Sequence, residues 1–191
     1  MAPPLLRCAI EEILDWHAHL YIEPHVVAFV AVAGQYSPSP ARFDVECRNV
    51  VSRWLGKAAE CRLEVSWNGG TAEKATRLRA TMQPSPLVEL ASIALALILG
   101  SRVAPLGPLD VTQFGARADY RARKRRAVLE ISGTEVPDEL GRRHREKVAQ
   151  ARGNPFGWDA YVVVCAFSAG GHRIRFTRHP FEEAEHGEGQ G

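Results

Sequence analysis

The spacing of apolar residues along the first sixty positions predicts two helices and one strand. Residues 5–22 (LLRCAIEEILDWHAHLYI) place apolar side chains at helical intervals, which favours a helix. Residues 26–33 (VVAFVAVA) are apolar and rich in β-branched side chains, which is typical of a buried strand. Asp44 is a potential N-cap for a second helix, because apolar residues then recur at positions 47, 50, 51, 54, 55 and 58.

The middle of the chain predicts a β-hairpin and then a buried helix. Residues 61–67 alternate between apolar and polar, residues 68–70 (NGG) supply a turn, and residues 75–82 return as a second strand. Residues 87–99 are apolar on nearly every side, so we expect the helix they form to be buried. The Ser-Pro step at 85–86 supplies the cap and the first turn of this helix.

The C-terminal half predicts a second hairpin, a helix and two further strands. In residues 115–150, two strands close a hairpin around a turn at 123–126, and a helix follows that begins near Pro137. Residues 161–167 (YVVVCAF) have the composition of a central strand. Residues 172–178 alternate as they would in a half-exposed edge strand.

Two carboxylates in the second hairpin are the candidate catalytic groups. Asp119 lies near the end of the first strand and Glu130 lies in the second, so antiparallel pairing brings their side chains together. Two carboxylates at one point repel each other unless a cation lies between them, and a divalent metal ion is the usual cation. The spacing therefore predicts a metal site in this hairpin.

Positive charge is concentrated around the acidic pair. The net charge of the whole chain is only +2, but residues 115–181 hold fourteen Lys and Arg against seven Asp and Glu. Residues 1–114 carry a net charge of −1, and the Gly-rich tail 182–191, which we expect to be disordered, carries −4. Basic surface around an acidic pair is what a metal-dependent phosphodiesterase needs. The residues expected to bind nucleic acid here are Arg117, Arg121, Arg123, Lys124, Arg125 and Arg126.

The pattern Asp119-(x)10-Glu130-x-Ser132, followed by a helix and an apolar strand, resembles the core of the PD-(D/E)xK nuclease superfamily. The resemblance covers roughly residues 86–178. It implies an α/β fold with a restriction-endonuclease-like core (helix, β-hairpin, helix, strand, strand) at residues 85–181. Residues 1–84 would then form an N-terminal α+β extension, and the acidic tail would follow the core.

The resemblance also implies a ligand set for the metal. Asp119 takes the place of the family's Asp and Glu130 that of its second acid. Mg²⁺ (or Mn²⁺) is the expected ion, with the carbonyl oxygen of Ile131 as a third ligand. A helix with an acidic residue precedes the hairpin in this family, and Glu89 is the residue that fills this place.

The family's Lys is missing, since Ser132 stands at its position. A hydroxyl group cannot offset negative charge on a phosphate as an ammonium group does. Lys147 or Arg143 on the following helix is therefore the expected source of the catalytic cation. Gln150 resembles the helix Gln that some of these nucleases place beside the metal site.

The predicted function is that of a metal-dependent nuclease, with DNA as the expected nucleic acid. By analogy, a chain of this size acts with other protein subunits in an assembly such as a prokaryotic antiphage defence system. Two alternatives remain open. One is a catalytically inactive nuclease-fold subunit that binds nucleic acid or serves as a scaffold, which Ser132 favours. The other is a protein–protein adaptor whose apolar N-terminal half docks a partner.

The cytoplasm is the expected location, without a membrane partner. The four cysteines show no CxxC spacing, and three lie in apolar runs, as buried free thiols do. The N-terminus lacks the pattern of a signal peptide. The longest apolar run, residues 87–99, is too short to span a bilayer.

Two further patterns have a functional and a structural interpretation. His17 and His19 have the His-x-His spacing of some metal sites, but on a helix they point to different faces, so exposed imidazoles at a helix end are expected. Phe156 and Trp158 offer surfaces for base stacking, but we favour a role in anchoring their loop to the core.

Overall fold

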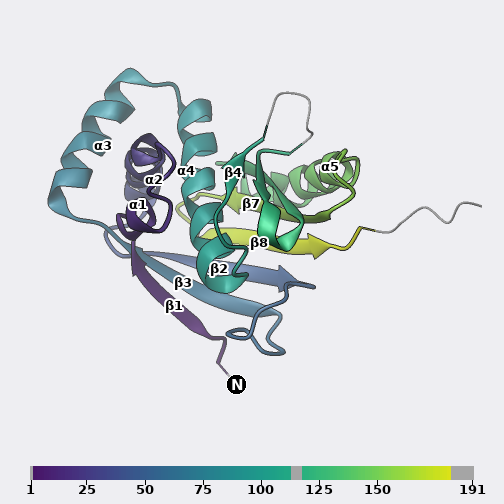
Figure 1. Cartoon of the computed structure of the whole chain (residues 1–191). Helices are drawn as coiled ribbons and strands as arrows, with labels where there is room; N and C mark the ends of the chain where they lie inside the picture. Colours follow the sequence, from purple (N-terminus) through teal and green to yellow (C-terminus); the bar gives the residue numbers. More distant parts are fainter. Residues whose placement is uncertain (1, 113–117, 182–191) are drawn as a thin grey trace, which may run out of the picture.

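A computed structural model describes residues 2–112 and 118–181 and shows an α/β protein built on a mixed sheet (Figure 1). The strand order in the described sheet is β1-β3-β2-β8-β7-β6-β5-β4. The strands are β1 Leu5–Ala9, β2 Ala41–Arg48, β3 Glu60–Ser66, β4 Asp110–Val111, β5 Tyr120–Ala122, β6 Ala127–Thr134, β7 Asp159–Ala166 and β8 His172–His179. Pairing is parallel for β1–β3, β2–β8 and β6–β7, and antiparallel for the other neighbours.

The helices cover the two faces of the sheet unequally. They are α1 Glu12–Trp16, α2 Glu23–Tyr36, α3 Gly69–Thr81, α4 Pro84–Ile98 and α5 Leu140–Arg152, with a π-helical turn at Leu99–Val103 and 3-10 turns at Arg123–Arg125 and Pro137–Glu139. Figure 1 shows α1–α4 gathered together and α5 apart from them. The large core lies among α1–α4 and one face of the sheet, whereas a smaller cluster joins α5 to the other face of β6 and β7.

The predictions for the C-terminal half are largely confirmed. The second hairpin is formed by β5 and β6 around the 3-10 turn Arg123–Arg125, and α5 and β7 follow in the expected order. The apolar helix is α4, which is buried as expected but begins at Pro84 and has no side-chain cap. The prediction of an edge position for β8 is wrong, because β8 lies between β2 and β7. Of its three arginines, only Arg173 is exposed, while Arg175 and Arg178 are half-buried.

Two N-terminal predictions are wrong: a strand lies where a helix was expected, and a helix lies where a strand was expected. Residues 5–22 begin with β1, because Leu6 and Cys8 alternate into the core while their neighbours face outwards, and only a short α1 follows. Residues 26–33 belong to α2, and all eight of them are buried in the large core, where α2 packs against α3 and α4. An apolar run that is buried all round carries no periodicity, so its composition does not separate a strand from a helix.

Two more predictions are wrong in the same way. The expected helix after Asp44 is the strand β2, whose residues alternate strictly between core and surface. The expected strand at 75–82 lies in α3, because Asn68 acts as an N-cap instead of a hairpin turn residue. Its side-chain oxygen accepts a hydrogen bond from the backbone N–H of Thr71 at 2.8 Å.

A close approach of α4 to β6 fixes the position of the hairpin. A Cβ atom added at Gly133 would lie 2.2 Å from Ser92 Oγ and 2.7 Å from the carbonyl oxygen of Val88. Only glycine therefore fits this point of β6 while α4 stays in place. Together with its π-helical extension, α4 spans Pro84–Val103, which by length and composition could cross a membrane, but it is mostly buried inside the molecule.

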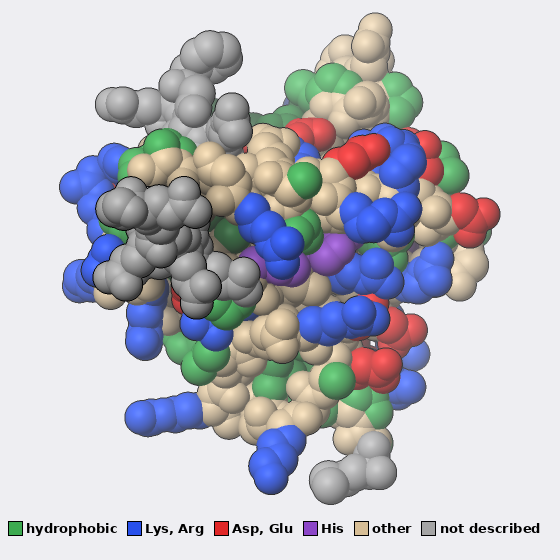
Figure 2. Space-filling view, turned by 90° about the vertical axis from the view of Figure 1, so that its right-hand side faces the viewer, with side chains coloured by type: hydrophobic (Ala, Val, Ile, Leu, Met, Phe, Trp, Pro, Cys, Tyr) green, Lys and Arg blue, Asp and Glu red, His purple; other side chains and the backbone are tan. Residues whose placement is uncertain are grey.

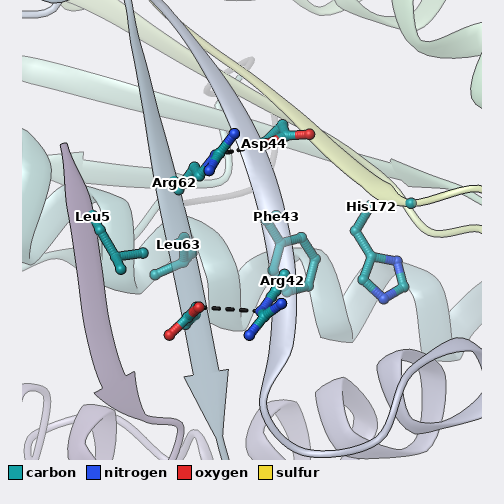
Figure 3. Close-up of a pocket in the computed structure, with 9 residues that line it drawn as sticks. Leu5, Arg42, Phe43, Asp44, Arg62, Leu63 and His172 are labelled. Atoms are coloured by element: carbon teal, nitrogen blue, oxygen red, sulfur yellow. Dashed lines mark ion pairs between the residues drawn. The ribbon is translucent and has the colours of Figure 1, made fainter. Parts of the chain in front are cut away.

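The face of β1, β3 and β2 opposite the large core carries ion pairs (Figure 3). Arg42 of β2 pairs with Glu64 of β3 at 3.1 Å, and Arg62 of β3 pairs with Asp44 of β2 at 3.7 Å. The first 84 residues thus add three strands to the same sheet as the rest of the chain. The expected division into an extension and a core stays a prediction.

Candidate active site

The β5–β6 hairpin brings Asp119 and Glu130 to neighbouring positions. Pairing of Tyr120 with Leu129 sets the register, and the backbone N–H of Asp119 donates to the carbonyl oxygen of Leu129 at 3.1 Å. Asp119 lies directly before β5 and not near the end of a strand. Its Oδ2 atom accepts a hydrogen bond from the backbone N–H of Ile131 at 2.7 Å. This bond continues the hairpin by one step and holds the carboxylate against β6.

Glu130 is a fully buried acid that faces α5. Its side chain has an exposed fraction of 0% and lies on the same face of β6 as Val128, which packs in the α5 cluster. Lys147 of α5 donates from Nζ to Glu130 Oε1 at 2.5 Å. The other oxygen, Oε2, is buried and has no hydrogen-bond partner among the described residues. A buried carboxylate oxygen without a partner is costly, so Oε2 is the acceptor that a further ligand could use.

The pKa values of both acids reflect this environment. Burial raises the pKa of Glu130 to about 7, and the negative charges of Asp119 and Glu89 add to the rise, while Lys147 opposes it. Burial also raises the pKa of Asp119, against the hydrogen bond from Ile131 and the positive charge of Lys147. Each carboxylate thus lies within electrostatic reach of Lys147, and the charge of Asp119 is felt by Glu130. Lys147 thus contacts Glu130, and the hairpin holds Asp119 beside the same strand; the role of the three as a catalytic site stays a prediction.

The remaining predicted residues divide into those near this cluster and those held elsewhere. Glu89 is exposed on α4, close enough to influence the pKa of Glu130. The side-chain oxygen of Gln150 accepts a long hydrogen bond of 3.4 Å from Lys147 Nζ. Arg143, in contrast, pairs with Glu139 at 2.9 Å. Ser132 is buried two residues beyond Glu130 on the same face of β6.

The basic residues of the hairpin form its exposed turn. Lys124, Arg125 and Arg126 are exposed and belong to none of the ion pairs formed by the described residues. Arg123 pairs with Asp110 at 3.0 Å. The expected contributor Arg121 is half-buried, 4.0 Å from the same acid, and Arg117 lies outside the described residues. Figure 2, which faces the α5 side of the molecule, shows Lys and Arg side chains over much of that surface.

The donor set suits a hard cation such as Mg²⁺. Within residues 2–112 and 118–181, no three His, Cys, Asp or Glu side chains are grouped closely enough to form a complete metal site. Mg²⁺, however, is usually bound through one or two carboxylates and keeps several waters. Two adjacent carboxylates, one with a buried oxygen that lacks a partner, meet that requirement.

Sequence reasoning missed a histidine cluster between α5 and β8. His144 Nε2 and His179 Nε2 lie 2.8 and 2.9 Å from the hydroxyl oxygen of Thr177, which is buried. Burial, followed by the charge of Arg175, lowers the pKa of His144 to about 4. The four residues come from two elements that are distant in the sequence, so no local pattern could have indicated the cluster.

Two predictions about aromatic residues have different outcomes. His17 is not exposed but buried, and its Nε2 lies 2.9 Å from Ser101 Oγ. The preferred role for Phe156 and Trp158 is confirmed, because their rings stack at 5.1 Å and pack against the α5 cluster. All four cysteines are buried and free, as expected.

Comparisons of the chain with protein-family models, with curated proteins and with solved structures gave no match.

Proposed function

We propose that this protein is a metal-dependent nuclease with a restriction-endonuclease-like core. The observation that carries the proposal is the partly buried cluster of Asp119, Glu130 and Lys147, in which Glu130 keeps an oxygen without a partner. Clusters of acids with raised pKa values next to a cation occur at catalytic sites more often than elsewhere. A basic turn on the same hairpin supports nucleic acid as the substrate, with DNA as its expected form.

The order of elements gives further support. A helix, a three-strand meander, a second helix and a parallel strand follow one another as α4, β4–β6, α5 and β7. The resemblance to the PD-(D/E)xK nucleases implies a helix, a β-hairpin, a helix and two strands, and β5 and β6 correspond to this hairpin. Asp119 precedes the middle strand and Glu130 lies within the last strand of the meander. The parallel pairing of β6 with β7 requires the α5 crossover, and α5 is the element that supplies Lys147.

Asp119, Glu130 and the carbonyl oxygen of Ile131 are the groups that would hold Mg²⁺, with Glu89 near enough to add negative charge. When bound, the ion supplies Lewis-acid stabilisation of the phosphate that is cleaved. The hydrogen bond from Ile131 N–H keeps the Asp119 carboxylate aimed at β6 before any ligand arrives. Such preorganisation lowers the free-energy cost of assembling the site.

Lys147 takes the role that the family's motif Lys would have. Ser132 is neutral and buried, so it adds no positive charge. The Lys147 ammonium group already lies against Glu130 at 2.5 Å and retains partial exposure, which gives it access to a bound phosphate. It offsets the negative charge that builds up in phosphoryl transfer. Arg143 is engaged by Glu139 and is therefore the weaker candidate.

The test is cleavage of labelled single- and double-stranded DNA and RNA with Mg²⁺ or Mn²⁺. We expect Asp119→Ala and Lys147→Ala each to abolish cleavage while binding stays largely intact. Arg143→Ala is the matched control on the same helix face and should retain activity. Ser132→Lys should leave cleavage unchanged or lower it, because it adds a second cation to a site where Lys147 already supplies one. Cleavage by the wild type that persists in Asp119→Ala would exclude this site as its source.

An inactive nuclease-fold subunit is the second candidate, and the Lys147–Glu130 ion pair favours it. In a relic this pair would serve only to neutralise a buried acid. The wild type would then bind nucleic acid without cleaving any substrate, and Asp119→Ala would leave binding unchanged. The same cleavage and binding measurements therefore separate the two candidates.

A further inference from the structure

We propose that a second cavity of this protein binds a nucleotide unit, that is, a phosphate together with a planar base. The cavity has a volume of about 640 Å³ and lies between the loop at residues 49–59, the end of α4 and the strands β7 and β8. We call it the arginine cavity. The lining residues that matter here are Arg53, Trp54, Arg102, Arg125, Tyr161 and Arg178. Its size is that of typical small-molecule sites.

The lining of the arginine cavity has an excess of positive charge. Four arginines line it, against one acid, Asp159. Asp159 is already engaged by Arg178 at 2.7 Å, and Arg102 has Glu12 at 3.8 Å. Arg53 and Arg125 take part in no ion pair within the described part of the chain. A planar guanidinium group binds phosphate through two parallel hydrogen bonds, so two free arginines in one cavity favour a phosphate ligand.

An aromatic surface is presented on an anchored loop. Val51 and Trp54 have exposed fractions of 64% and 38%. The loop is nevertheless fixed, because Leu55 is buried and its backbone N–H donates to Ser52 Oγ at 3.2 Å. The anchored loop therefore presents the Trp54 ring at the cavity. An indole ring beside free arginines suits a base that stacks while its phosphate is bound.

The π-helical turn at the end of α4 forms part of the wall of the arginine cavity. The backbone N–H of Ala104 donates to the carbonyl of Leu99 at 2.9 Å, and that of Leu106 donates to Gly100 at 2.8 Å. These bonds widen the last turn, which carries Arg102. Arg102 lines the cavity, and its guanidinium group lies 5.0 Å from the ring centre of Trp16, which is not among the lining residues. Irregular turns of this kind are frequent at functional sites.

A smaller hollow with different lining residues provides the contrast. The hollow lined by residues of β1, β3 and β2 has a volume of about 460 Å³ (Figure 3). Its two arginines are both neutralised, Arg42 by Glu64 and Arg62 by Asp44. The arginine cavity differs in having free cations and an exposed indole ring, and these are the features that select an anion with a planar ring.

The arginine cavity adjoins the hairpin of the proposed active site but does not depend on it. Arg125 belongs to the β5–β6 turn and also lines a neighbouring hollow with Arg126, Trp158 and Phe181. Two sources of the ligand share the same chemistry. It is either a free nucleotide or one unit of a nucleic-acid strand that passes the turn. Binding can be measured without metal, so the outcome is independent of any cleavage.

The experiment measures binding of adenosine 5′-monophosphate and of a short fluorescent oligothymidylate to the full chain in the presence of EDTA. Arg53→Ala and Trp54→Ala should each weaken binding about tenfold, since one phosphate contact or one stacked base is removed. Trp54→Phe should retain most of the affinity. Arg42→Ala, in the neutralised hollow, is the matched control and should bind as the wild type does.

Each outcome decides the proposal. Variant-sensitive binding of the mononucleotide supports a site for a free nucleotide. Variant-sensitive binding of the oligonucleotide alone supports a site for one unit of a strand. The proposal is overturned if neither probe binds below about 1 mM. Equal affinity of the wild type, Arg53→Ala and Trp54→Ala would overturn it as well.

Discussion

Glu130 is the residue on which the proposed chemistry depends, and its burial has a measurable consequence for stability. A carboxyl group whose pKa is about 7 in the folded chain, against 4.5 in the unfolded chain, binds its proton more tightly when folded. Its contribution to stability is fully present below pH 4.5 and is lost as the pH rises through 7. The size of this effect is about 3 kcal/mol.

Replacing this acid with a neutral isostere should therefore flatten the pH dependence. Relative to the wild type, Glu130→Gln should gain about 3 kcal/mol of unfolding free energy between pH 5 and pH 8. The measurement is urea unfolding of both proteins without metal across that range. Glu146→Gln is the control, because this exposed acid of α5 makes only a surface ion pair with Arg142 of the same helix. A constant difference between Glu130→Gln and the wild type at all pH values would contradict the raised pKa.

The partner of Glu130 gives a second prediction at this scale. Lys147→Met leaves the buried carboxylate without its cation, so it should lower the unfolding free energy by about 3 kcal/mol at about pH 8. At about pH 5 the loss should be smaller, because Glu130 is then protonated. Arg143→Met removes only a partly exposed pair with Glu139 and should cost less than about 1 kcal/mol. Thermal unfolding at the two pH values tests both variants, and equal losses would contradict the pairing.

Residue spacing predicted the meeting of Asp119 and Glu130 but did not decide which cation joins them. Antiparallel register alone places the two acids side by side, so that prediction needed no tertiary information. Lys147 and Arg143 share a helix face, and spacing gives them equal access. The choice is made by Glu139, four residues before Arg143, which engages the guanidinium group within the helix itself.

At the scale of elements, whether the sequence predicted a helix or strand correctly depends on how that segment is buried. The strands β6 and β7 and the helix α5 lie where flanking turn residues mark their ends, and sequence pattern located them. The segment of α2 is buried all round and shows no periodicity, so composition favoured the wrong element. In residues 49–59, apolar residues recur at helical spacing, but the structure has no helix there. Their Trp54 and Val51 face solvent, which a prediction based on burial cannot anticipate.

The packing of α4 on β6 yields a prediction for the element that carries Glu130. Gly133→Ala should destabilise the protein by about 3 kcal/mol, because its Cβ meets Ser92 and Val88 at distances that no side chain tolerates. Gly69→Ala, in the first turn of α3, is the control. Its Cβ meets nothing within 4 Å, so the change should be neutral or slightly stabilising. Chemical denaturation measures both, and a neutral Gly133→Ala would contradict the close approach.

At the scale of the whole molecule, the sequence predicted an α/β fold, but it did not predict that both halves of the chain share one sheet. Counts of charged residues located the basic region, since such counts do not depend on whether a segment is predicted as a helix or as a strand. The joining of both halves in one sheet rests on the parallel pairing of β2 with β8, between residues more than a hundred positions apart. Pairings of such range leave no local pattern, and they also place the arginine cavity between segments from the two halves.

The distribution of charge over the molecule leads to a final prediction about nucleic-acid binding. Each phosphate contact contributes about 0.9 to the slope of log affinity against log salt for duplex DNA. Replacing Arg123, Arg125 and Arg126 together by Ala should lower affinity and reduce the slope by about 2. The fold should survive, because the three side chains lie on an exposed turn. Fluorescence anisotropy with labelled duplex and single strands at several salt concentrations gives both quantities.

A control with the same change in net charge makes this prediction specific to the turn. Arg7, Arg42 and Arg62 are exposed arginines on the strands β1, β2 and β3, and each is paired with Glu64 or Asp44. Their joint replacement by Ala also removes three positive charges, but from a face where each of the three arginines is paired with an acid. We expect this triple variant to keep most of the wild-type salt dependence. Equal losses in the two triple variants would mean that binding follows net charge alone, and the hairpin turn would lose its assignment as the nucleic-acid contact.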